Sequence, residues 1–363
     1  MCNSSSQLVD PVISYLTAYS YDAAVRDAHL IGGGAVGSLE DKLREQYGFE
    51  FVVLTSSGTA GLFITALAID LSDAQFIASV YGYGATLSAW LALRNTPVFV
   101  DIDHTTLNVD PSLIASAVNE HSRAILSTDL FGVPSDTEAI REIADRHGIW
   151  YVADGCQAFG ATVNRRAASY LADAHIVSFT SGKDLAIGEG GAVLTNDADL
   201  YRRLLWVGQH PYRQKRELGI STFNPFAINA RIHPVAAVWG SAIFETSLER
   251  VHRKQEIYSQ ALSVLDGSGL IERFDPVSNG LLPSYFCLAV EPRVPVAEMI
   301  DALLEEGFAS TAFKPPAMAF HQSDILKGML GERIGPGSSF PVAERVAEKY
   351  IALTVEKYEG GKC

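Results

Sequence analysis

The chain has 363 residues, of which 48% are hydrophobic and 19% charged, so it can bury a sizeable core and is not expected to be disordered. Its formal net charge of −14 argues against binding to nucleic acid or to anionic membrane surfaces. No apolar run reaches membrane-spanning length, and the four cysteines form no C-x-x-C pair, so we expect a reduced cytoplasmic protein without a metal site.

Short runs rich in β-branched and apolar residues alternate with helical patterns between about residues 35 and 195. The predicted strands are residues 51–54, 76–80, 97–100, 124–127, 149–153, 174–179 and 192–194. The predicted helices between them include residues 57–70, 85–94 and 137–147. This alternation is typical of βαβ units, and it predicts an α/β fold with a mostly parallel sheet that is buried on both faces.

The pattern changes after Pro234. A long helix is expected from there to about residue 265, followed by a strand at 285–290, a helix at 296–306 and a final helix at 342–358. We therefore predict a large domain of residues 1–240 and a smaller C-terminal α+β domain of residues 241–363.

The segment Ser56-Ser57-Gly58-Thr59-Ala60 joins a predicted strand to a predicted helix. The first turn of a helix offers free backbone N–H groups and the positive end of the helix dipole, which suit a phosphate. Gly58 allows a close approach of the backbone, and the hydroxyl groups add donors. The alternative is an ordinary helix cap by Ser or Thr.

Two further polar segments follow predicted strands. Asp154, at the end of the 149–153 run, could keep a pyridinium nitrogen protonated, and Gln157 could bond a ring hydroxyl. Lys183 lies in a glycine-rich turn and could form a Schiff base with an aldehyde cofactor, with Ser178 near the same phosphate. The alternatives are a turn aspartate and an exposed loop lysine.

Two glycine-rich segments resemble nucleotide-binding motifs without meeting their requirements. Gly32–Gly37 matches G-x-G-x-x-G, but the residues before it look helical, whereas a dinucleotide site needs a strand there. Ser181-Gly182-Lys183 resembles the end of a P-loop, but Val177 and Asp184 stand where that motif needs Gly and Ser or Thr.

Taken together, the segments resemble the DegT/StrS family of sugar aminotransferases, which depend on pyridoxal 5′-phosphate (PLP) and have the aspartate-aminotransferase fold (type I). The similarity covers nearly the whole chain, and it is specific because many segments match in order and spacing. These are residues 30–34, 39–43, 55–62, 85–86, 97–101, 107–111, 130–134, 154–160, 178–196, 229–237 and 340–345.

The resemblance implies roles for residues around the cofactor ring. Lys183 matches the lysine that binds PLP covalently, and Asp154 matches the partner of the pyridine nitrogen. Gln157 matches the residue near the ring hydroxyl, and Tyr83 matches the aromatic residue that stacks on the ring. By the same resemblance, Lys183 and Asp154 are the expected catalytic residues.

The resemblance also implies the phosphate contacts and the assembly. Gly58, Thr59 and Ser178 match phosphate ligands, and Asn229 matches a residue that reaches the phosphate from the neighbouring subunit of a homodimer. Arg231 is a candidate partner for the donor carboxylate, because a guanidinium grips a carboxylate through two hydrogen bonds.

The implied reaction moves an amino group from glutamate or glutamine to a keto-sugar or keto-cyclitol. One alternative keeps PLP but catalyses a dehydration or another natural-product reaction; relatives that dehydrate sugars carry His where this chain has Lys183. A second alternative is a non-catalytic regulatory protein on the same fold. The sequence departs from the family pattern at Ala153 and at His233-Pro234, and residues 208–233 and 310–322 are expected to wall the substrate pocket.

Overall fold

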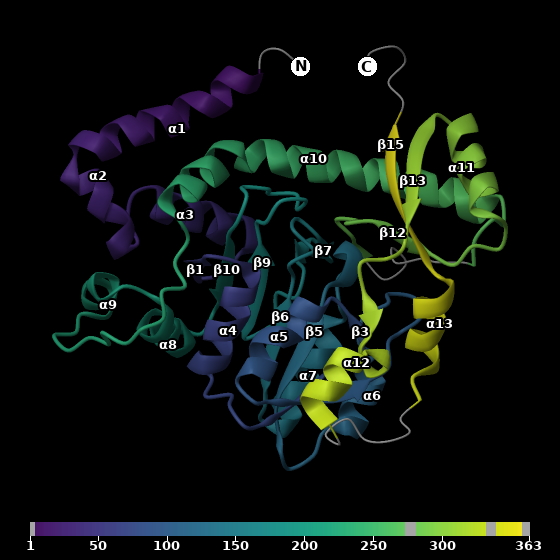
Figure 1. Cartoon of the computed structure of the whole chain (residues 1–363), viewed down its shortest axis with the longest axis horizontal. Helices are drawn as coiled ribbons and strands as arrows, with labels where there is room; N and C mark the ends of the chain where they lie inside the picture. Colours follow the sequence, from purple (N-terminus) through teal and green to yellow (C-terminus); the bar gives the residue numbers. More distant parts are fainter. Residues whose placement is uncertain (1–3, 273–280, 332–338, 358–363) are drawn as a thin grey trace.

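A computed structural model describes residues 4–272, 281–331 and 339–357 (Figure 1). Before the first strand of the central sheet the chain forms α1 (Ser4–Tyr21), α2 (Ala23–Ala28), a 3-10 turn η1 (His29–Ile31) and α3 (Ala35–Tyr47). The Gly32–Gly37 segment thus follows helical turns and no strand, so it lacks the context of a dinucleotide site.

The centre of the molecule is a seven-stranded sheet in the order β1-β10-β9-β6-β5-β2-β4. Its strands are β1 (Phe51–Thr55), β2 (Gln75–Ser79), β4 (Thr96–Val100), β5 (Ser122–Thr128), β6 (Trp150–Asp154), β9 (Ala174–Ser178) and β10 (Gly191–Thr195). Neighbouring strands from β4 to β9 pair in parallel, whereas β10 is antiparallel to both β9 and β1. The predicted α/β fold with a mostly parallel sheet is confirmed.

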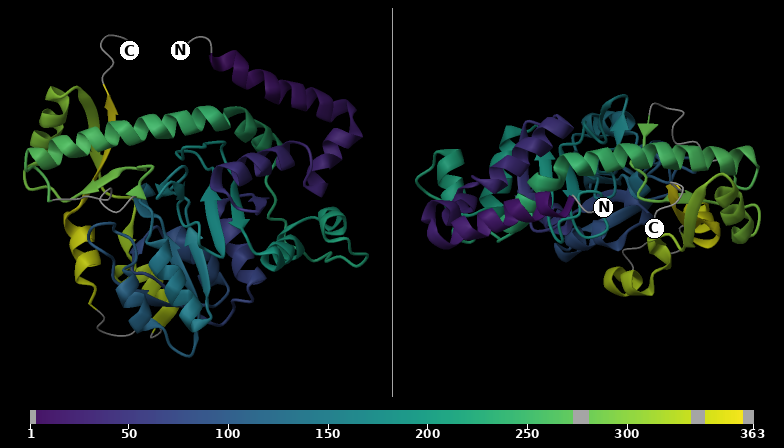
Figure 2. Two further views of the ribbon diagram at one scale, coloured as in Figure 1. Left: turned by 180° about the vertical axis from the view of Figure 1, so that it is seen from behind. Right: turned by 90° about the horizontal axis from the view of Figure 1, so that it is seen from above.

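Helices cover both faces of this sheet (Figures 1 and 2). On one face, α4 (Gly58–Ala68), α5 (Gly84–Ala92) and α8 (Ala198–Gly208) pack over alternate strand residues such as Val53 and Leu126. On the other face, α3, α6 (Pro111–Ala117) and α7 (Thr137–His147) cover the intervening residues such as Leu54 and Ile125. Apolar residues at consecutive positions of a strand therefore serve two cores, as expected for a sheet buried on both sides.

The helix that joins the two parts of the chain is α10 (Pro234–Gly267). Its first half packs through Ile243 and Phe244 against the large sheet, and its second half packs through Tyr258 and Leu265 against the C-terminal core. α1 lies beside α10 (Figure 2). The boundary that we predicted at residue 240 falls inside α10, and the division into two domains stays a prediction.

The C-terminal part contains a second, antiparallel sheet in the order β12-β15-β13. Its strands are β12 (Leu288–Val290), β13 (Phe308–Phe313) and β15 (Ile351–Lys357), and α11 (Val296–Glu305) packs beside it. α13 (Pro341–Lys349) precedes β15. The prediction of one helix over 342–358 was therefore wrong, because residues 351–357 form the middle strand of this sheet; residue 358 lies outside the described residues.

Short elements complete the described chain. They are β3 (Tyr81–Gly82), η2 (Leu130–Gly132), β7 (Thr162–Val163), β8 (Arg166–Ala167), α9 (Pro211–Leu218), β11 (Leu281–Leu282), β14 (Met318–Ala319), η3 (Phe320–Gln322) and α12 (Asp324–Leu330). β14 pairs with β3, so a segment of the C-terminal part lies against the chain just before Tyr83. None of the described helices is both long and apolar enough to cross a membrane.

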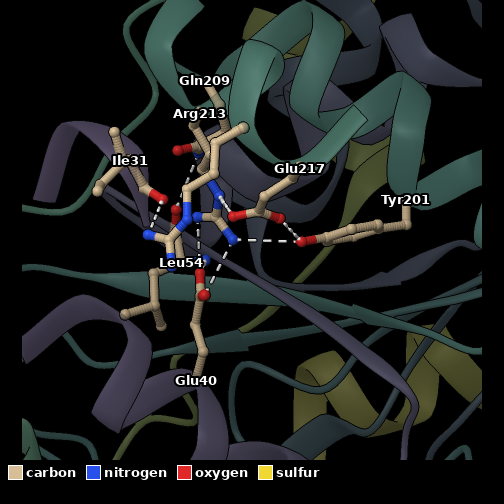
Figure 3. A network of polar contacts seen from close by, with 8 residues as sticks. Ile31, Glu40, Leu54, Tyr201, Gln209, Arg213 and Glu217 are labelled. Atoms are coloured by element: carbon tan, nitrogen blue, oxygen red, sulfur yellow. Dashed lines mark hydrogen bonds and ion pairs between the residues drawn. The ribbon is translucent and has the colours of Figure 1, made fainter. Parts of the chain in front are cut away.

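The outer edge of β1 is held by a buried network of polar side chains (Figure 3). Arg213 of α9 makes two hydrogen bonds of 2.9 Å to the carboxylate of Glu40 of α3, and both side chains are nearly inaccessible, at 2% and 4% exposed. Glu40 also accepts the backbone N–H of Leu54, and Gln209 donates to the Leu54 carbonyl. The network thereby fixes the segment that begins at Gln209 to the strand that leads into Ser56–Ala60.

Candidate active site

The predicted phosphate site lies at the N-terminus of α4. Ser57 caps this helix, its hydroxyl accepting the N–H of Ala60 at 3.0 Å. A Cβ atom added to Gly58 would lie 2.5 Å from Cys156 Sγ and 3.1 Å from Ser178 Cβ, so no other residue fits between α4 and the neighbouring strand ends. The backbone N–H groups of Gly58 and Thr59, at the start of the helix, are the ones that can bind an anion beside Ser178.

Asp154, at the end of β6, is buried and held from two sides. Its Oδ2 accepts a hydrogen bond of 2.6 Å from the hydroxyl of Thr86 on α5, and its Oδ1 accepts the N–H of Cys156 at 3.1 Å. Tyr83 caps the same helix α5, and its side chain is more than half exposed. The start of α5 and the end of β6 thus bring an aromatic ring and a carboxylate to one cavity.

Lys183 lies in the turn between β9 and β10. Gly182 and Gly188 both adopt positive φ angles, of 88° and 86°, which fold the turn back on itself. The Nζ atom of Lys183 lies 4.6 Å from the centre of the Phe286 ring. Burial lowers the pKa of Lys183, while the nearby Cys156, Asp154 and Asp184 act in the opposite direction. Such an amine is more readily neutral than a surface lysine.

Gln157 is fixed by the backbone of a neighbouring turn. Its Oε1 accepts the N–H of Phe131 at 2.7 Å, which leaves its NH₂ group as a donor. Phe131 has a positive φ of 56°, and its carbonyl accepts the N–H of Phe286 at 2.8 Å. Gln157 and Phe286 are therefore positioned by the same turn.

These residues surround one cavity of about 410 Å³, a volume within the range of small-molecule sites. Seven of the nine predicted site residues line it: Gly58, Thr59, Tyr83, Asp154, Gln157, Ser178 and Lys183. The other two do not belong to its lining in the described part of the chain. Asn229 is exposed and Arg231 is half-buried, next to Ala230, whose carbonyl accepts the N–H of Ser56 at 2.7 Å. Asn229 and Arg231 thus lie beside the Ser56–Ala60 segment, but they do not line the cavity of their own subunit.

The cavity also contains residues that sequence reasoning did not select, among them Thr86, Cys156 and Phe286. Thr86 has a local signal that would have selected it, because it lies in the first turn of a helix that follows a predicted strand. Phe286 comes from the C-terminal part of the chain, and no local pattern connects it to the strand ends of the sheet. Pro316, which also lines the cavity, lies within residues 310–322, the segment that was expected to wall the substrate pocket.

Comparison with known proteins places this arrangement in a family. The family model of the DegT/DnrJ/EryC1/StrS aminotransferases matches residues 18–358. The chain belongs to this family. The chain is 32% identical to a UDP-N-acetyl-3-dehydro-alpha-D-glucosamine 3-aminotransferase of Acidithiobacillus ferrooxidans. The match covers 90% of this chain and 85% of that protein.

A second relative carries a different kind of name. The chain is 32% identical to a pleiotropic regulatory protein of Geobacillus stearothermophilus, over 92% of this chain and 87% of that protein. Among solved structures, DesI determined in the presence of its TDP-sugar product superposes with a TM-score of 0.73 at 28% identity, covering 95% of this chain and 84% of that one. Family membership and fold are thus established along almost the whole chain.

Proposed function

We propose that this family member is a PLP-dependent aminotransferase that moves an amino group from glutamate or glutamine to a keto-sugar or keto-cyclitol in sugar or natural-product biosynthesis. The observation that carries the proposal is the shared cavity of Lys183, Asp154 and the N-terminus of α4. An amine, a carboxylate and an anion site are the three groups that a phosphorylated pyridine aldehyde needs.

The residues present fit this cofactor. Gly58, Thr59 and Ser178 would hold its phosphate at the start of α4, where the missing Cβ of Gly58 lets Ser178 lie against the backbone of the helix start. Asp154 would face the pyridine nitrogen, and Lys183 would bind the aldehyde carbon. When bound, the cofactor supplies the electron sink that amino-group transfer requires.

Tyr83 and Gln157 would fix the plane of the cofactor ring. Tyr83 offers a ring face at the mouth of the cavity, and Gln157 offers the NH₂ group that Phe131 leaves free. Stacking and one oriented hydrogen bond together restrict rotation of a planar ligand.

Lys183 is proposed to act as the base that removes the proton from Cα of the amino donor. A base must be neutral before it can accept a proton, and burial beside Phe286 lowers the pKa of this amine in the required direction. Arg231 is the proposed partner of the donor carboxylate, since a guanidinium binds a carboxylate through two parallel hydrogen bonds.

The working assembly is proposed to be a homodimer in the cytoplasm, with Asn229 completing the phosphate site of the partner subunit. Large apolar side chains on the segment around α8 and α9 support this: Phe226 is 90% exposed, and Trp206, Tyr212 and Ile228 are also exposed. Apolar side chains gathered on one exposed segment favour a protein interface.

The proposed cytoplasmic location rests on the cysteine usage of the sequence, with Cys156 and Cys287 present as free thiols.

The first experiment is reduction of the protein with borohydride after incubation with PLP, followed by mapping of the modified peptide. We expect the pyridoxyl group on Lys183 and its loss in Lys183→Ala. Incubation with keto substrates and ¹⁵N-labelled glutamate or glutamine then tests transfer of nitrogen. A chain that binds PLP but transfers nitrogen to no ketone would favour a dehydratase or another PLP reaction. A chain that binds no PLP would favour a regulatory role, as the name of the Geobacillus relative suggests.

The shared site is tested by mixing two defective variants, Lys183→Ala and Asn229→Ala. In a mixed dimer, one site has the intact Lys183 of one subunit and the intact Asn229 of the other, so activity should return. Random exchange gives about a quarter of the sites in this state. No recovery after denaturation and joint refolding, with each variant alone refolding as a dimer, would contradict the proposed role of Asn229.

A further inference from the structure

Two side chains of α10 bind the turn that carries Lys183. Lys254 of α10 forms an ion pair and hydrogen bond with the carboxylate of Asp184, the residue after Lys183. One turn earlier on α10, Arg250 donates to the backbone carbonyl of Asp184 at 3.2 Å and to the hydroxyl of Ser247 at 2.9 Å. Both the main chain and the side chain of Asp184 are thus bound to one helix.

The ion pair is sheltered from water. The Asp184 side chain is 15% exposed and that of Lys254 is 23% exposed. Charges in such positions interact more strongly than surface charges, because less solvent screens them. A change in the charge of either partner will therefore be felt by groups near Asp184.

Lys183 is the group near Asp184 whose protonation such a change would alter. Groups from several elements lie near its amine. Asp154 ends β6 and Cys156 follows it, Asp184 belongs to the same turn, and the Phe286 ring comes from the C-terminal part. Tyr83 and Glu189 line the same cavity. The carboxylate of Asp154 already has two hydrogen-bond donors, Thr86 and the Cys156 N–H. Asp184 has its counter-charge in Lys254.

We propose that Lys254 is a positioning residue for Lys183: by pairing with Asp184 it cancels a carboxylate charge beside the reactive amine and fixes the turn that carries it. The inference rests on the proposed function, in which Lys183 binds the cofactor and moves the proton. It assigns to α10, the helix that joins the two parts of the chain, control over how readily Lys183 releases a proton.

The proposal predicts the direction in which each substitution shifts the basicity of the Lys183 amine. Without Lys254, the unpaired Asp184 carboxylate attracts a proton to Lys183 and makes its amine more basic, in the same direction as the effect that Asp184 already has on the Lys183 pKa. Without the Asp184 charge, the unpaired Lys254 ammonium repels that proton and makes the amine less basic. Removal of both charges should restore nearly the original balance.

The experiment is a double-mutant cycle on the full chain without added cofactor. The proteins are the wild type, Lys254→Met, Asp184→Asn and the double variant, with Lys254→Arg as the conservative control. The rate at which a small amine-reactive reagent modifies Lys183, followed by peptide mass spectrometry across pH, gives the midpoint for its protonation. We expect Lys254→Met to raise this midpoint by roughly half a unit to one unit, and Asp184→Asn to lower it by a similar amount. The double variant and Lys254→Arg should lie near the wild type.

A second readout uses the same proteins loaded with PLP. The pH dependence of the visible absorbance reports protonation at the nitrogen of Lys183, and its midpoint should move in the same directions. Equal midpoints in all five proteins, with only melting temperatures changed, would overturn the proposal and leave a purely structural ion pair. Failure to bind PLP would abolish the second readout alone, so it would count against the proposed function and not against the pairing of Lys254 with Asp184.

Discussion

Thr86 is the residue whose contact with the site is easiest to test, because its hydroxyl makes one short hydrogen bond to Asp154. Thr86→Val keeps the shape of the side chain and removes that donor. A hydrogen bond to a charged group contributes about 1.5–3 kcal/mol, so the dissociation constant of PLP should rise by about tenfold or more. A fluorescence titration of the cofactor measures it.

Thr86→Ser is the matched control, since it keeps the hydroxyl and loses only a methyl group. Its affinity for PLP should stay close to that of the wild type. A similar loss of affinity in both variants would indicate that packing of the methyl group matters and the hydrogen bond does not.

At the residue scale, the sequence predicted only those site residues that lie next to a recognisable strand end. Lys183, Asp154 and Gly58 each follow a predicted strand, and the carboxyl ends of parallel strands meet at one edge of a sheet, so their convergence could be foreseen. Phe286 could not be foreseen, because its place over Lys183 depends on a backbone hydrogen bond to Phe131, from a distant part of the chain.

At the scale of elements, the Glu40–Arg213 pair decides whether α9 stays on the edge of β1 (Figure 3). Arg213→Met leaves the Glu40 carboxylate buried without its counter-charge, which typically costs about 3–5 kcal/mol of unfolding free energy. Urea unfolding followed by circular dichroism gives the value.

The double variant Glu40→Gln/Arg213→Met is the control for that prediction. The amide oxygen of the new side chain can still accept the N–H of Leu54 but carries no charge, so most of the lost stability should return. A double variant as unstable as Arg213→Met would show that the packing of the arginine, and not the stranded charge, stabilises the wild type.

Elements were predictable from the sequence when local pattern and tertiary environment agreed. The helix predicted around residues 137–147 agrees with α7, which Asp136 caps through the N–H of Ala139 and which Gly148 ends with a positive φ. Residues 351–357 belong to the predicted final helix of residues 342–358, but they form β15. They pair with β12 and β13 on both sides, and only the folded molecule contains those partners.

At the scale of the whole molecule, His175 should make the free energy of unfolding decrease as the pH falls. It is fully buried in β9, neither ring nitrogen has a hydrogen-bond partner among the described residues, and burial lowers its pKa to about 3. The folded pKa lies below the ordinary value near 6.5, so the neutral ring stabilises the protein above pH 6.5, and this contribution is lost as the pH falls towards 3. The loss amounts to about 4 kcal/mol.

His175→Leu should remove this component. We expect the unfolding free energy of the variant to fall less steeply than that of the wild type between about pH 6.5 and the lowest pH at which both fold. The comparison uses the slope against pH, so a constant offset from altered packing does not affect it. Parallel slopes would mean that other groups cause the acid sensitivity.

The pairing of β14 with β3 has a consequence for synthesis of the protein on the ribosome. The wall of the cavity that includes Pro316 belongs to a segment made long after Lys183, Asp154 and α4 have left the ribosome. The sheet can form from the first two hundred residues or so, but its ligand site is enclosed only when the segment around Met318–Ala319 arrives. We therefore expect the completed chain, and not the nascent one, to capture the cofactor. Ribosome-bound chains stalled before and after this segment would differ in that respect.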